Sequence, residues 1–483
     1  MTGERARLVC RFGRPARTFR CLSTATSANT MTMTHHRPNK SRYHASKRLL
    51  VALAPVLFLL PALAAKDPWV VLNDDGGWCW FEDPRAVMDA GKLVAGTVAN
   101  GSRDRARKGD IEVVSYDLAG GIPIRSTLHK NLQADDHNSP ALWLRPDGRW
   151  LALYAMHGNE NRIYCRVSLR PHDATEWQPE KVFVPSPSTR VTYSNPHFLG
   201  GENVPRGRIY NFFRGYDNTA KPSWMFSDDL GENWQMGGLL IDFQAARKHR
   251  PYVKYAGNGR DTIHFAFTEG HPMEFDTGIY HAVYRAGQLH DSRGRSVRSL
   301  TQGPILPSEA TRIFAGNSNN IAWIHGLALD DRGRPRLVCT VQKNAAGVPK
   351  GKAGQDLRYR FARWDGSKWH DAEIAFAGST LYVGEDDYAG GICLHPDDPN
   401  TVFISANVNP STGQSPSRFE IYRGHTRDQG ATWTWTPVTR DSPVDNLRPI
   451  VPSSGTNQTL LLWLRGRYLR FINYDLEVVL ARF

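Results

Sequence analysis

The stretch "SPALWLRPDGRWLALYAMHG" (residues 139–158) decides the fold, because it reads as a β-hairpin that the chain repeats. Apolar residues alternate with other residues on both sides of a Pro-Asp-Gly turn, as in two antiparallel strands. Six further segments follow the same plan of apolar strand, Gly, Asp or Asn turn, and second apolar strand. They begin at Pro84, Asn195, Arg250, Ile324, Gly390 and Arg448.

This repetition predicts an all-β fold, a seven-bladed β-propeller of four-stranded antiparallel blades, as a single domain over residues 66–483. Outer strands are expected at 163–169, 278–288 and 358–369. Residues 69–74 precede the first hairpin, and we expect them to pair with the C-terminal strands and close the ring. A six-bladed ring with one misread hairpin is the alternative.

Residues 1–65 differ in composition from the rest of the chain. They hold eleven Lys or Arg residues and one acidic residue, and they end in the apolar run "LLVALAPVLFLLPALA" (49–64). A basic flank, a short apolar run and an Ala-Leu-Ala end are typical of a secretory signal peptide. We therefore expect a removed leader and an exported, periplasmic or extracellular protein. We also expect a monomer without a membrane span.

The charge of the remaining chain argues against nucleic acid as a partner. Of the formal net charge of +13, only +3 lies outside the leader. Four cysteines follow the leader, with spacings that match no zinc motif. They are Cys79, Cys165, Cys339 and Cys393. Disulfides and buried free thiols are both compatible with this pattern.

Two short segments share the pattern S/T-x-D-x-G-x-x-W, namely "SDDLGENW" (227–234) and "TRDQGATW" (426–433). The aspartate can accept hydrogen bonds from backbone N–H groups of the turn, and the glycine can take a positive φ. The pattern is that of the Asp-box turn between outer strands of sialidase-like propellers. It indicates the fold and not the function.

The repeat also predicts where functional groups gather. The innermost strand of a blade and its neighbour run in opposite directions, so the start of the first and the end of the second lie on one face. His137 and His157 occupy these two positions in one hairpin. The same reasoning places polar residues of every blade at this mouth, which predicts a binding and catalytic surface. In the first blade these residues are Glu82, Asp83, Arg85 and Asn100.

Several longer motifs resemble a known family. They are "GWCWFEDPRAV", "HNSPAL" with a histidine twenty residues on, "TYSNPHFL", "FFRG", "RPYVKY" and "EDDYAGGICLHPDDPNTVFISANVNP". Together they are similar to the BNR-repeat propeller polysaccharide lyases, the group of ulvan lyases and rhamnose–glucuronate lyases. The resemblance covers about residues 77–448 and implies a lyase that cleaves a uronic-acid-containing glycan. The turn "GENVPRGR" lengthens the family pattern at the far end of its hairpin.

The resemblance implies four catalytic residues, His137, His157, Tyr193 and Arg214. β-Elimination removes the C5 proton beside a uronate carboxylate and expels the group on C4. Arginine can neutralise the carboxylate, histidine can take the proton, and tyrosine can protonate the leaving oxygen. We expect His137 as base, Tyr193 as acid, Arg214 as neutraliser and His157 as a positioning group.

Other polar residues near the strand starts are expected to bind substrate. They are Asn138, Asn195, Arg250, His271, His325, Tyr388 and Arg448. No cofactor is required, and acidic residues such as Asp386 and Asp387 allow either a structural Ca²⁺ or simple capping of a turn. Two alternatives stay open, an exo-acting hydrolase of the sialidase or rhamnosidase type and a non-catalytic glycan-binding propeller. Arg85, Arg250 and Arg448 could imitate the three arginines of a sialidase-like site, although the full catalytic set of such a site is not found. The alternative is that they only brace neighbouring blades.

Overall fold

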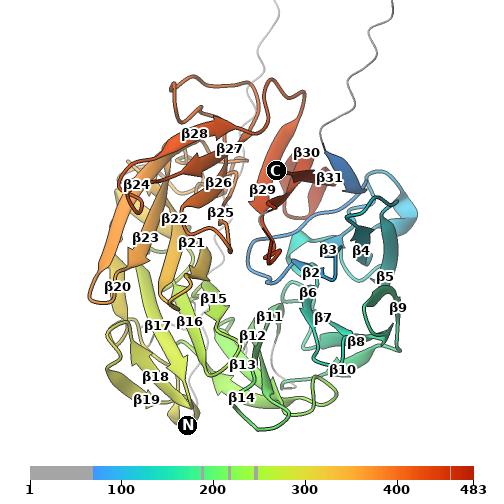
Figure 1. Ribbon diagram of the computed structural model, residues 1–483. Helices are drawn as coiled ribbons and strands as arrows, with labels where there is room; N and C mark the ends of the chain where they lie inside the picture. Colours follow the sequence, from blue (N-terminus) through green and yellow to red (C-terminus); the bar gives the residue numbers. More distant parts are fainter. Residues whose placement is uncertain (1–68, 187–189, 216–218, 244–248, 457) are drawn as a thin grey trace, which may run out of the picture. The chain divides into compact units, whose positions relative to one another are not determined.

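A computed structural model describes residues 69–483 except 187–189, 216–218, 244–248 and 457. The expected leader and signal peptide lie outside the described residues. Seven antiparallel sheets are arranged in a ring (Figure 1). Each of the seven hairpins predicted from the sequence forms the two inner strands of one sheet. The seven-bladed propeller is therefore confirmed, and the six-bladed alternative is wrong.

The first three blades follow one another directly along the chain. Blade 1 contains β2 (Ala86–Asp89), β3 (Lys92–Val98), β4 (Ile111–Asp117) and β5 (Ile124–His129). Blade 2 contains β6 (Ala141–Leu144), β7 (Trp150–Tyr154), β8 (Ile163–Arg170), β9 (Asp173–Trp177) and β10 (Lys181–Phe183). Blade 3 contains β11 (Thr192–Leu199), β12 (Arg208–Arg214), β13 (Pro222–Ser227) and β14 (Gln235–Leu239).

The remaining blades complete the ring. Blade 4 contains β15 (Val253–Gly257), β16 (Thr262–Phe267), β17 (Ile279–Arg285), β18 (Gln288–Asp291), β19 (Ser296–Ser299) and β20 (Thr311–Phe314). Blade 5 contains β21 (Asn320–Leu329), β22 (Pro335–Lys343), β23 (Leu357–Trp364) and β24 (Trp369–Gly378). Blade 6 contains β25 (Ile392–Leu394), β26 (Thr401–Ala406), β27 (Glu420–His425) and β28 (Thr434–Pro437). Blade 7 contains β29 (Asp445–Ile450), β30 (Leu460–Arg470), β31 (Asn473–Arg482) and β1 (Val70–Asn73).

The ring closes as the sequence predicts, because β1 pairs antiparallel with β31 and so joins both ends of the propeller in blade 7 (Figure 1). The described helices are three single 3₁₀ turns, η1 (Arg105–Arg107), η2 (Asp136–Asn138) and η3 (Leu300–Gln302). In the described part of the chain, no helix is long and apolar enough to cross a membrane.

The two S/T-x-D-x-G-x-x-W segments form the same turn between the third and fourth strands of blades 3 and 6. In the first, Asp229 accepts hydrogen bonds from the Ser227 hydroxyl and the Asn233 amide, both at 2.8 Å. Gly231 has φ +89° and its N–H donates to the Ser227 hydroxyl, so the turn needs a residue without a side chain there. The second segment repeats these hydrogen bonds with Thr426 and Asp428.

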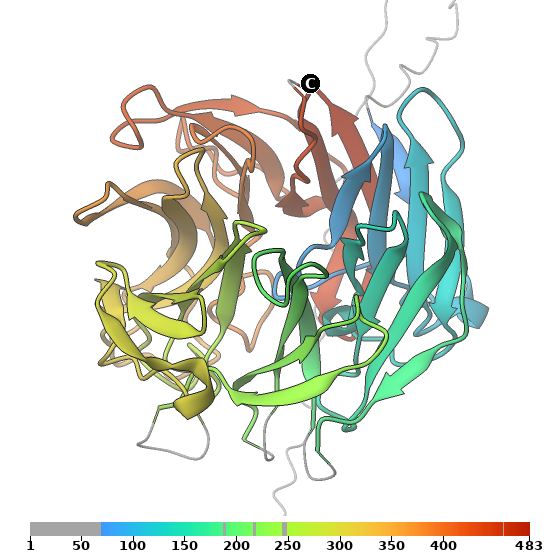
Figure 2. The same ribbon diagram turned by 60° about the horizontal axis from the view of Figure 1, so that its bottom comes forward.

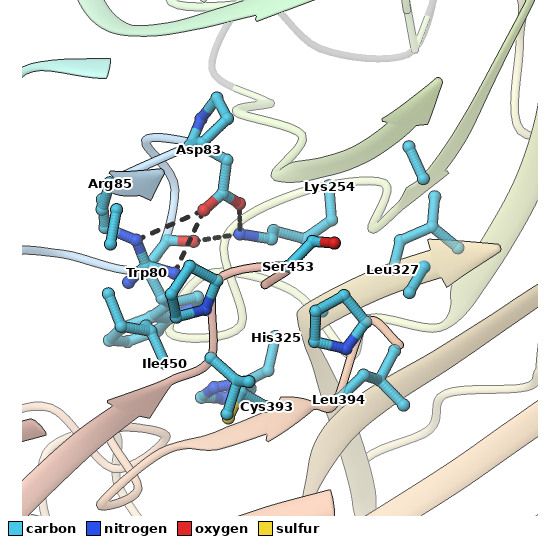
Figure 3. A pocket seen from close by; sticks show the side chains of 18 of the residues that line it. Trp80, Asp83, Arg85, Lys254, His325, Leu327, Cys393, Leu394, Ile450 and Ser453 are labelled. Atoms are coloured by element: carbon cyan, nitrogen blue, oxygen red, sulfur yellow. Dashed lines mark hydrogen bonds and ion pairs between the residues drawn. The ribbon is translucent and has the colours of Figure 1, made fainter. Parts of the chain in front are cut away.

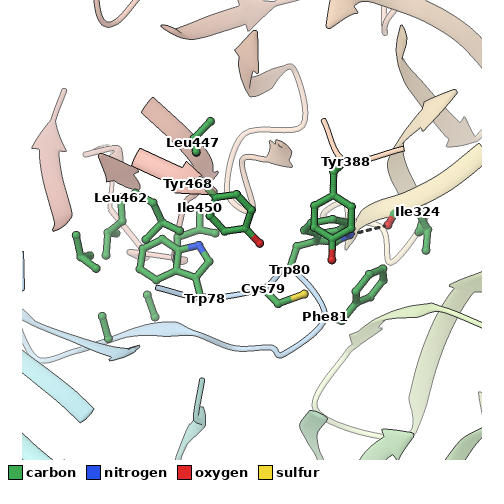
Figure 4. Close-up of a cluster of buried hydrophobic side chains, with 14 of the residues drawn as sticks. Trp78, Cys79, Trp80, Phe81, Ile324, Tyr388, Leu447, Ile450, Leu462 and Tyr468 are labelled. Carbon is green, nitrogen blue, oxygen red and sulfur yellow. Dashed lines mark hydrogen bonds between the residues drawn. The ribbon is translucent and has the colours of Figure 1, made fainter. Parts of the chain in front are cut away.

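The segment from Trp78 to Phe81 lies against the inner strands of several blades. The indole of Trp78 donates to the Arg448 carbonyl in blade 7, and that of Trp80 to the Ile324 carbonyl in blade 5. Figure 4 shows both rings in one apolar cluster with Phe81 and side chains of blades 5, 6 and 7. This segment, here called the plug, therefore fills the middle of the channel and separates its two ends.

The described cysteines are free thiols. Cys79, Cys165 and Cys339 are buried, and Cys393 is partly buried. Of the two possibilities that the sequence left open, the structure shows the unpaired one.

Candidate active site

His137 and His157 meet at one mouth of the propeller. His137 lies in η2, just before the innermost strand of blade 2, and His157 follows β7, the second strand. Their rings stack with centroids 4.0 Å apart and an interplanar angle of 11°. Figure 2, which is turned by 60° from Figure 1, shows the blades following one another around the ring. The hairpin geometry thus brings the two imidazoles together.

One carboxylate fixes both rings. Nδ1 of His137 lies 2.8 Å from one oxygen of Asp135, and Nδ1 of His157 lies 2.9 Å from the other. Asp135 is buried and also accepts the backbone N–H of His137 at 3.0 Å. Because both rings use Nδ1 for the same anion, each has Nε2 available for chemistry. Asp135 was not predicted, although it stands two residues before His137.

Tyr193 and Arg214 come from the neighbouring blade and face the same pair. The ring of Tyr193 is 5.7 Å from that of His137, and the guanidinium of Arg214 lies 4.8 Å from the Tyr193 centroid. Tyr193 has φ +69° at an irregular point of the β11–β12 register. A non-glycine residue in this conformation is strained, and such strain is concentrated at functional sites.

The phenol and the guanidinium of this pair have different partners. The buried hydroxyl of Tyr193 has no hydrogen-bond partner among the described residues. Arg214 donates to the hydroxyl of Tyr252 at 2.9 Å, which holds its planar group in place. The long turn within the β11–β12 hairpin leaves this pair intact, because it lies at the opposite end of the two strands.

The electrostatic environment divides the histidine pair into one charged and one neutral ring. Burial lowers the pKa of His137, but the ionisable groups around it, among them the carboxylates of Asp135 and Asp136, raise it more, to well above its usual value. Burial and the charge of His137 lower the pKa of His157 to about 4. At neutral pH the ring of His137 is therefore protonated and positively charged, and the ring of His157 is neutral.

Burial raises the pKa of Tyr193 well above its usual range, although His137 and Arg214 act in the opposite direction. The phenol is therefore protonated at neutral pH and can donate its proton. Arg214 remains charged under all these conditions. The site thus combines a proton donor, a neutral imidazole and two cationic groups within one cluster.

A cavity of about 470 Å³ opens beside this cluster. Its walls include three arginines, Arg190, Arg214 and Arg250, together with His157 and Thr192. Among the described residues, one carboxylate forms an ion pair with these arginines. It is Glu274, which lies 2.5 Å from Arg250. A cavity with this surplus of arginine suits an anionic ligand such as a uronate. Arg190 was not predicted from the sequence.

A buried network of hydrogen bonds around Asp136 holds His137 on the side of the channel. Asp136 accepts hydrogen bonds from the guanidinium of Arg448 and, at 2.7 Å, from the hydroxyl of Tyr468. Another oxygen of Asp136 lies 2.8 Å from Nδ1 of His137. Arg448 also donates to the carbonyl of Trp78 in the plug. Arg448, which the sequence offers either as a substrate-binding residue or as a brace between blades, is buried in an ion pair with Asp136.

The other predicted substrate-binding residues are divided among several places. Arg250 lines the mouth cavity, and His271 packs near it with its ring 5.3 Å from that of Tyr252. Asn138 and Asn195 are buried, and their amide groups donate to backbone carbonyls of Gln133 and Phe81.

Two of the predicted binding residues pack against the plug. The ring of Tyr388 is buried at 5.1 Å from Trp80. His325 stacks on the same indole at 4.7 Å and lines a second cavity at the other end of the channel. Asp83 and Arg85, expected at the mouth, line that second cavity too. Of the three arginines considered for a sialidase-like site, Arg250 lines the mouth cavity, whereas Arg85 and Arg448 line the second one.

Two groups of side chains bring metal-ligating atoms within 4.8 Å of one another. They are Cys79 with Asp136 and His137, and Asp135 with His137 and His157. Both rely on histidine nitrogen, whereas Ca²⁺ prefers oxygen ligands. Asp386 accepts the backbone N–H of Gly351 at 2.7 Å and so caps a loop. The expected structural Ca²⁺ stays a prediction.

The comparisons with known proteins agree with this architecture. No curated protein matches the chain significantly. Among solved structures, a PL25 ulvan lyase bound to -[GlcA(1-4)Rha3S]- covers 85% of this chain and 95% of its own, with a TM-score of 0.61 and 14% identity. The polysaccharide lyase Uly1 covers 85% and 96%, with a TM-score of 0.52 and 13% identity. At these identities the likeness shows the fold.

A family model carries the assignment further than these structures do. The model described as a BNR repeat-containing family member matches residues 104–377, which is more than half of the chain. The matched region runs from the third strand of blade 1 through blade 5. The chain therefore belongs to the BNR repeat-containing family.

Proposed function

We propose that this protein is a polysaccharide lyase that cleaves a uronic-acid-containing, rhamnose–uronate glycan by β-elimination at the His137–Tyr193 mouth. One observation carries the proposal. Two stacked imidazoles held by Asp135 face a phenol with an unpartnered hydroxyl, next to an arginine-rich cavity. The fold similarity to ulvan lyases supports the same class of reaction.

The first requirement of this reaction is a neutralised carboxylate, because the C5 proton of an ionised uronate is weakly acidic. Arg214 is held by Tyr252 and lines the cavity, so its free N–H groups can grip the carboxylate in a bidentate manner. The charged ring of His137 adds a second positive group nearby. Arg190 and Arg250 on the cavity wall would attract further anionic groups of the polymer.

The second requirement is a base. The sequence favours His137, but the charge states in the structure support an exchange of roles between the two histidines. His157 is neutral and lines the cavity, so its Nε2 can accept the C5 proton. Its Nδ1–H donates to Asp135, which stabilises the imidazolium that forms.

The third requirement is an acid for the leaving group. The C4–O bond breaks as the C4–C5 double bond forms, and the leaving oxygen needs a proton. Tyr193 is protonated and its hydroxyl has no other partner, so it can supply that proton. Every step draws on protein groups alone.

The proposal is tested with ulvan, gum arabic, glucuronoxylan and pectin, each monitored by ultraviolet absorbance of the conjugated double bond. We expect absorbance to rise with at least one of them, and not after its uronates have been reduced to neutral sugars. New reducing ends without absorbance would instead establish a hydrolase. Tight binding without any product would establish a glycan-binding propeller.

The identity of the base predicts a specific pH response. In the wild type, the acid limb of kcat/KM should lie near the pKa of His157, about 4, because activity requires this ring to be neutral. His137→Gln removes the positive charge that lowers this pKa, so the acid limb should move to higher pH. His157→Gln should lose the limb together with most of the activity.

The same two variants can also contradict the assignment of His157 as the base. If His137→Gln removes nearly all activity while His157→Gln keeps both the rate and the acid limb, the base is His137. Both variants keep a side chain of similar length at a stacked position. Thermal unfolding of each variant serves as the control for folding.

A further inference from the structure

The second cavity lies at the other ends of the innermost strands and has a volume of about 460 Å³. Its walls include the last residues of β15, β21 and β25, whereas the mouth cavity contacts the beginning of β11. The two cavities therefore open at opposite ends of the channel, with the plug between them.

The floor of the second cavity holds three charged groups (Figure 3). Lys254 donates to the carboxylate of Asp83 and to the carbonyl of Trp80. Arg85 donates to Asp83 at 3.1 and 3.3 Å and to the Cys79 carbonyl at 2.9 Å. These contacts use two of the three N–H groups of lysine and three of the five of arginine. Three cationic N–H groups are therefore left without a partner among the residues that the structure describes.

Lys254 and Arg85 carry one positive charge more than Asp83 balances. The other carboxylate on the cavity wall, Asp397, is solvent-exposed and accepts hydrogen bonds from Ser453 and Ser454. Glu82, which directly follows the plug in the chain, has no hydrogen-bond partner for either carboxyl oxygen among the described residues. Burial raises the pKa of Glu82 well above its usual value, so it does not neutralise the surplus. Arg448, which also lines the cavity, is already paired with Asp136. An unbalanced buried cation is costly unless an anion joins it.

The walls above the floor are mostly apolar. They include Leu327, Leu394 and Ile450, which Figure 3 shows at different places around the cavity. Two histidines add single polar atoms, because Nδ1 of His325 and Nε2 of His197 have no hydrogen-bond partner in the described chain. Burial lowers the pKa of His197 to about 4, so it is neutral and can donate or accept one hydrogen bond.

We propose that this second cavity is a binding site for a small organic monocarboxylate with an apolar body. The carboxylate would sit on Lys254 and Arg85 and use their three unpartnered N–H groups, while the body packs against Leu327, Leu394 and Ile450. The volume falls in the range of ordinary ligand pockets, about 300–1,000 Å³. A single surplus charge disfavours phosphate-like dianions, and the apolar walls disfavour a sugar acid.

Phenylacetate is the probe, titrated into the full chain in a calorimeter. Phenylacetamide, which has the same shape without the charge, and glucuronate, which has the charge without the apolar body, are the matched controls. We expect phenylacetate to bind at least about tenfold more tightly than either control. Equal binding of phenylacetate and phenylacetamide, tighter binding of glucuronate, or no binding of phenylacetate would each overturn the proposal.

Two wall variants locate the binding. Leu327→Glu places a negative charge beside the ligand without touching the floor, and Leu327→Gln is its neutral counterpart. Leu327 is partly exposed at the cavity wall, so both variants should fold. We expect Leu327→Glu to weaken phenylacetate binding about five- to tenfold more than Leu327→Gln does. Equal affinities of the two variants would place the ligand elsewhere.

A floor variant gives a second measurement. Lys254→Met removes the surplus charge, so phenylacetate should lose most of its preference over phenylacetamide. Glycan cleavage at the mouth is measured in the Leu327 variants at the same time. It should be unchanged, because Leu327 lies at the other end of the channel. The outcome of this test is therefore independent of the proposed lyase activity.

Discussion

Tyr193→Phe should lower kcat about 10²- to 10⁴-fold and leave the protein at least as stable as the wild type. The loss follows from the role of the phenol as the proton donor to the leaving oxygen. The unchanged stability follows from its surroundings, because the buried hydroxyl has no hydrogen-bond partner. Removing an unsatisfied buried hydroxyl eliminates a cost of about 1–3 kcal/mol and creates no new one.

The ring itself should stay in place in this variant. Phenylalanine keeps the contact with His137 and the position under the guanidinium of Arg214, since both involve the ring and not the hydroxyl. The measurement is kcat from ultraviolet absorbance, paired with urea unfolding at neutral pH. A rate within about threefold of the wild type would exclude Tyr193 as the acid.

Tyr252→Phe is the matched control for this experiment. It also removes one buried phenolic hydroxyl, but that hydroxyl accepts a hydrogen bond from Arg214 at 2.9 Å. We expect a smaller loss of kcat, with a rise in KM, because the arginine that holds the carboxylate becomes less well oriented. If both variants lose activity equally, the hydroxyl of Tyr193 has no special role.

The blades could be predicted because their signal is local. A hairpin such as 139–158 carries its own alternation and its own turn, so its strands are recognisable without knowledge of the rest. The meeting of His137 and His157 follows from the same local geometry. Their approach to Tyr193 and Arg214 requires only that consecutive blades be neighbours, and β6 and β11 are in contact.

The positions of His325 and Arg448 could not be predicted, because they depend on where a strand begins. The sequence placed the start of one inner strand at Ile324, but β21 begins at Asn320, and His325 falls at an irregularity in its middle. Arg448 likewise lies inside β29 with φ +51°. Both residues therefore lie further along their strands than His137, which precedes β6.

The plug was missed for a different reason. "WCWF" (78–81) lacks alternation and belongs to no strand, so neither strand nor turn patterns describe it. Its partners include Ile324 in blade 5 and Arg448 in blade 7, and Arg448 is 370 residues away from Trp78. Such long-range contacts leave no periodic trace in the sequence. The one available sign of the plug was the presence of three large aromatic side chains, Trp78, Trp80 and Phe81, in an irregular segment.

Arg448→Met should destabilise the protein by about 3–5 kcal/mol, the largest stability effect that we expect from a single substitution outside the apolar core. Asp136 is completely buried, and burial alone would raise its pKa, but the charge of Arg448 and the nearby His137 lower it. Without the arginine, an ionised carboxylate stays buried with one main cation gone. Methionine fills similar space, so the loss reflects charge and not volume.

A second substitution separates this explanation from a general packing defect. Asp136→Asn in the Arg448→Met background removes the stranded charge and still accepts the hydrogen bond of Tyr468. We expect the double variant to regain at least half of the lost free energy of unfolding, measured by urea denaturation at neutral pH. Asp136→Asn alone should also be destabilising, because it leaves Arg448 without its anion. The contradicting result is a double variant whose loss of unfolding free energy equals the sum of the two single losses. In that case the Arg448–Asp136 ion pair does not stabilise the contact between blade 7 and η2, and the packing of the plug against Arg448 does.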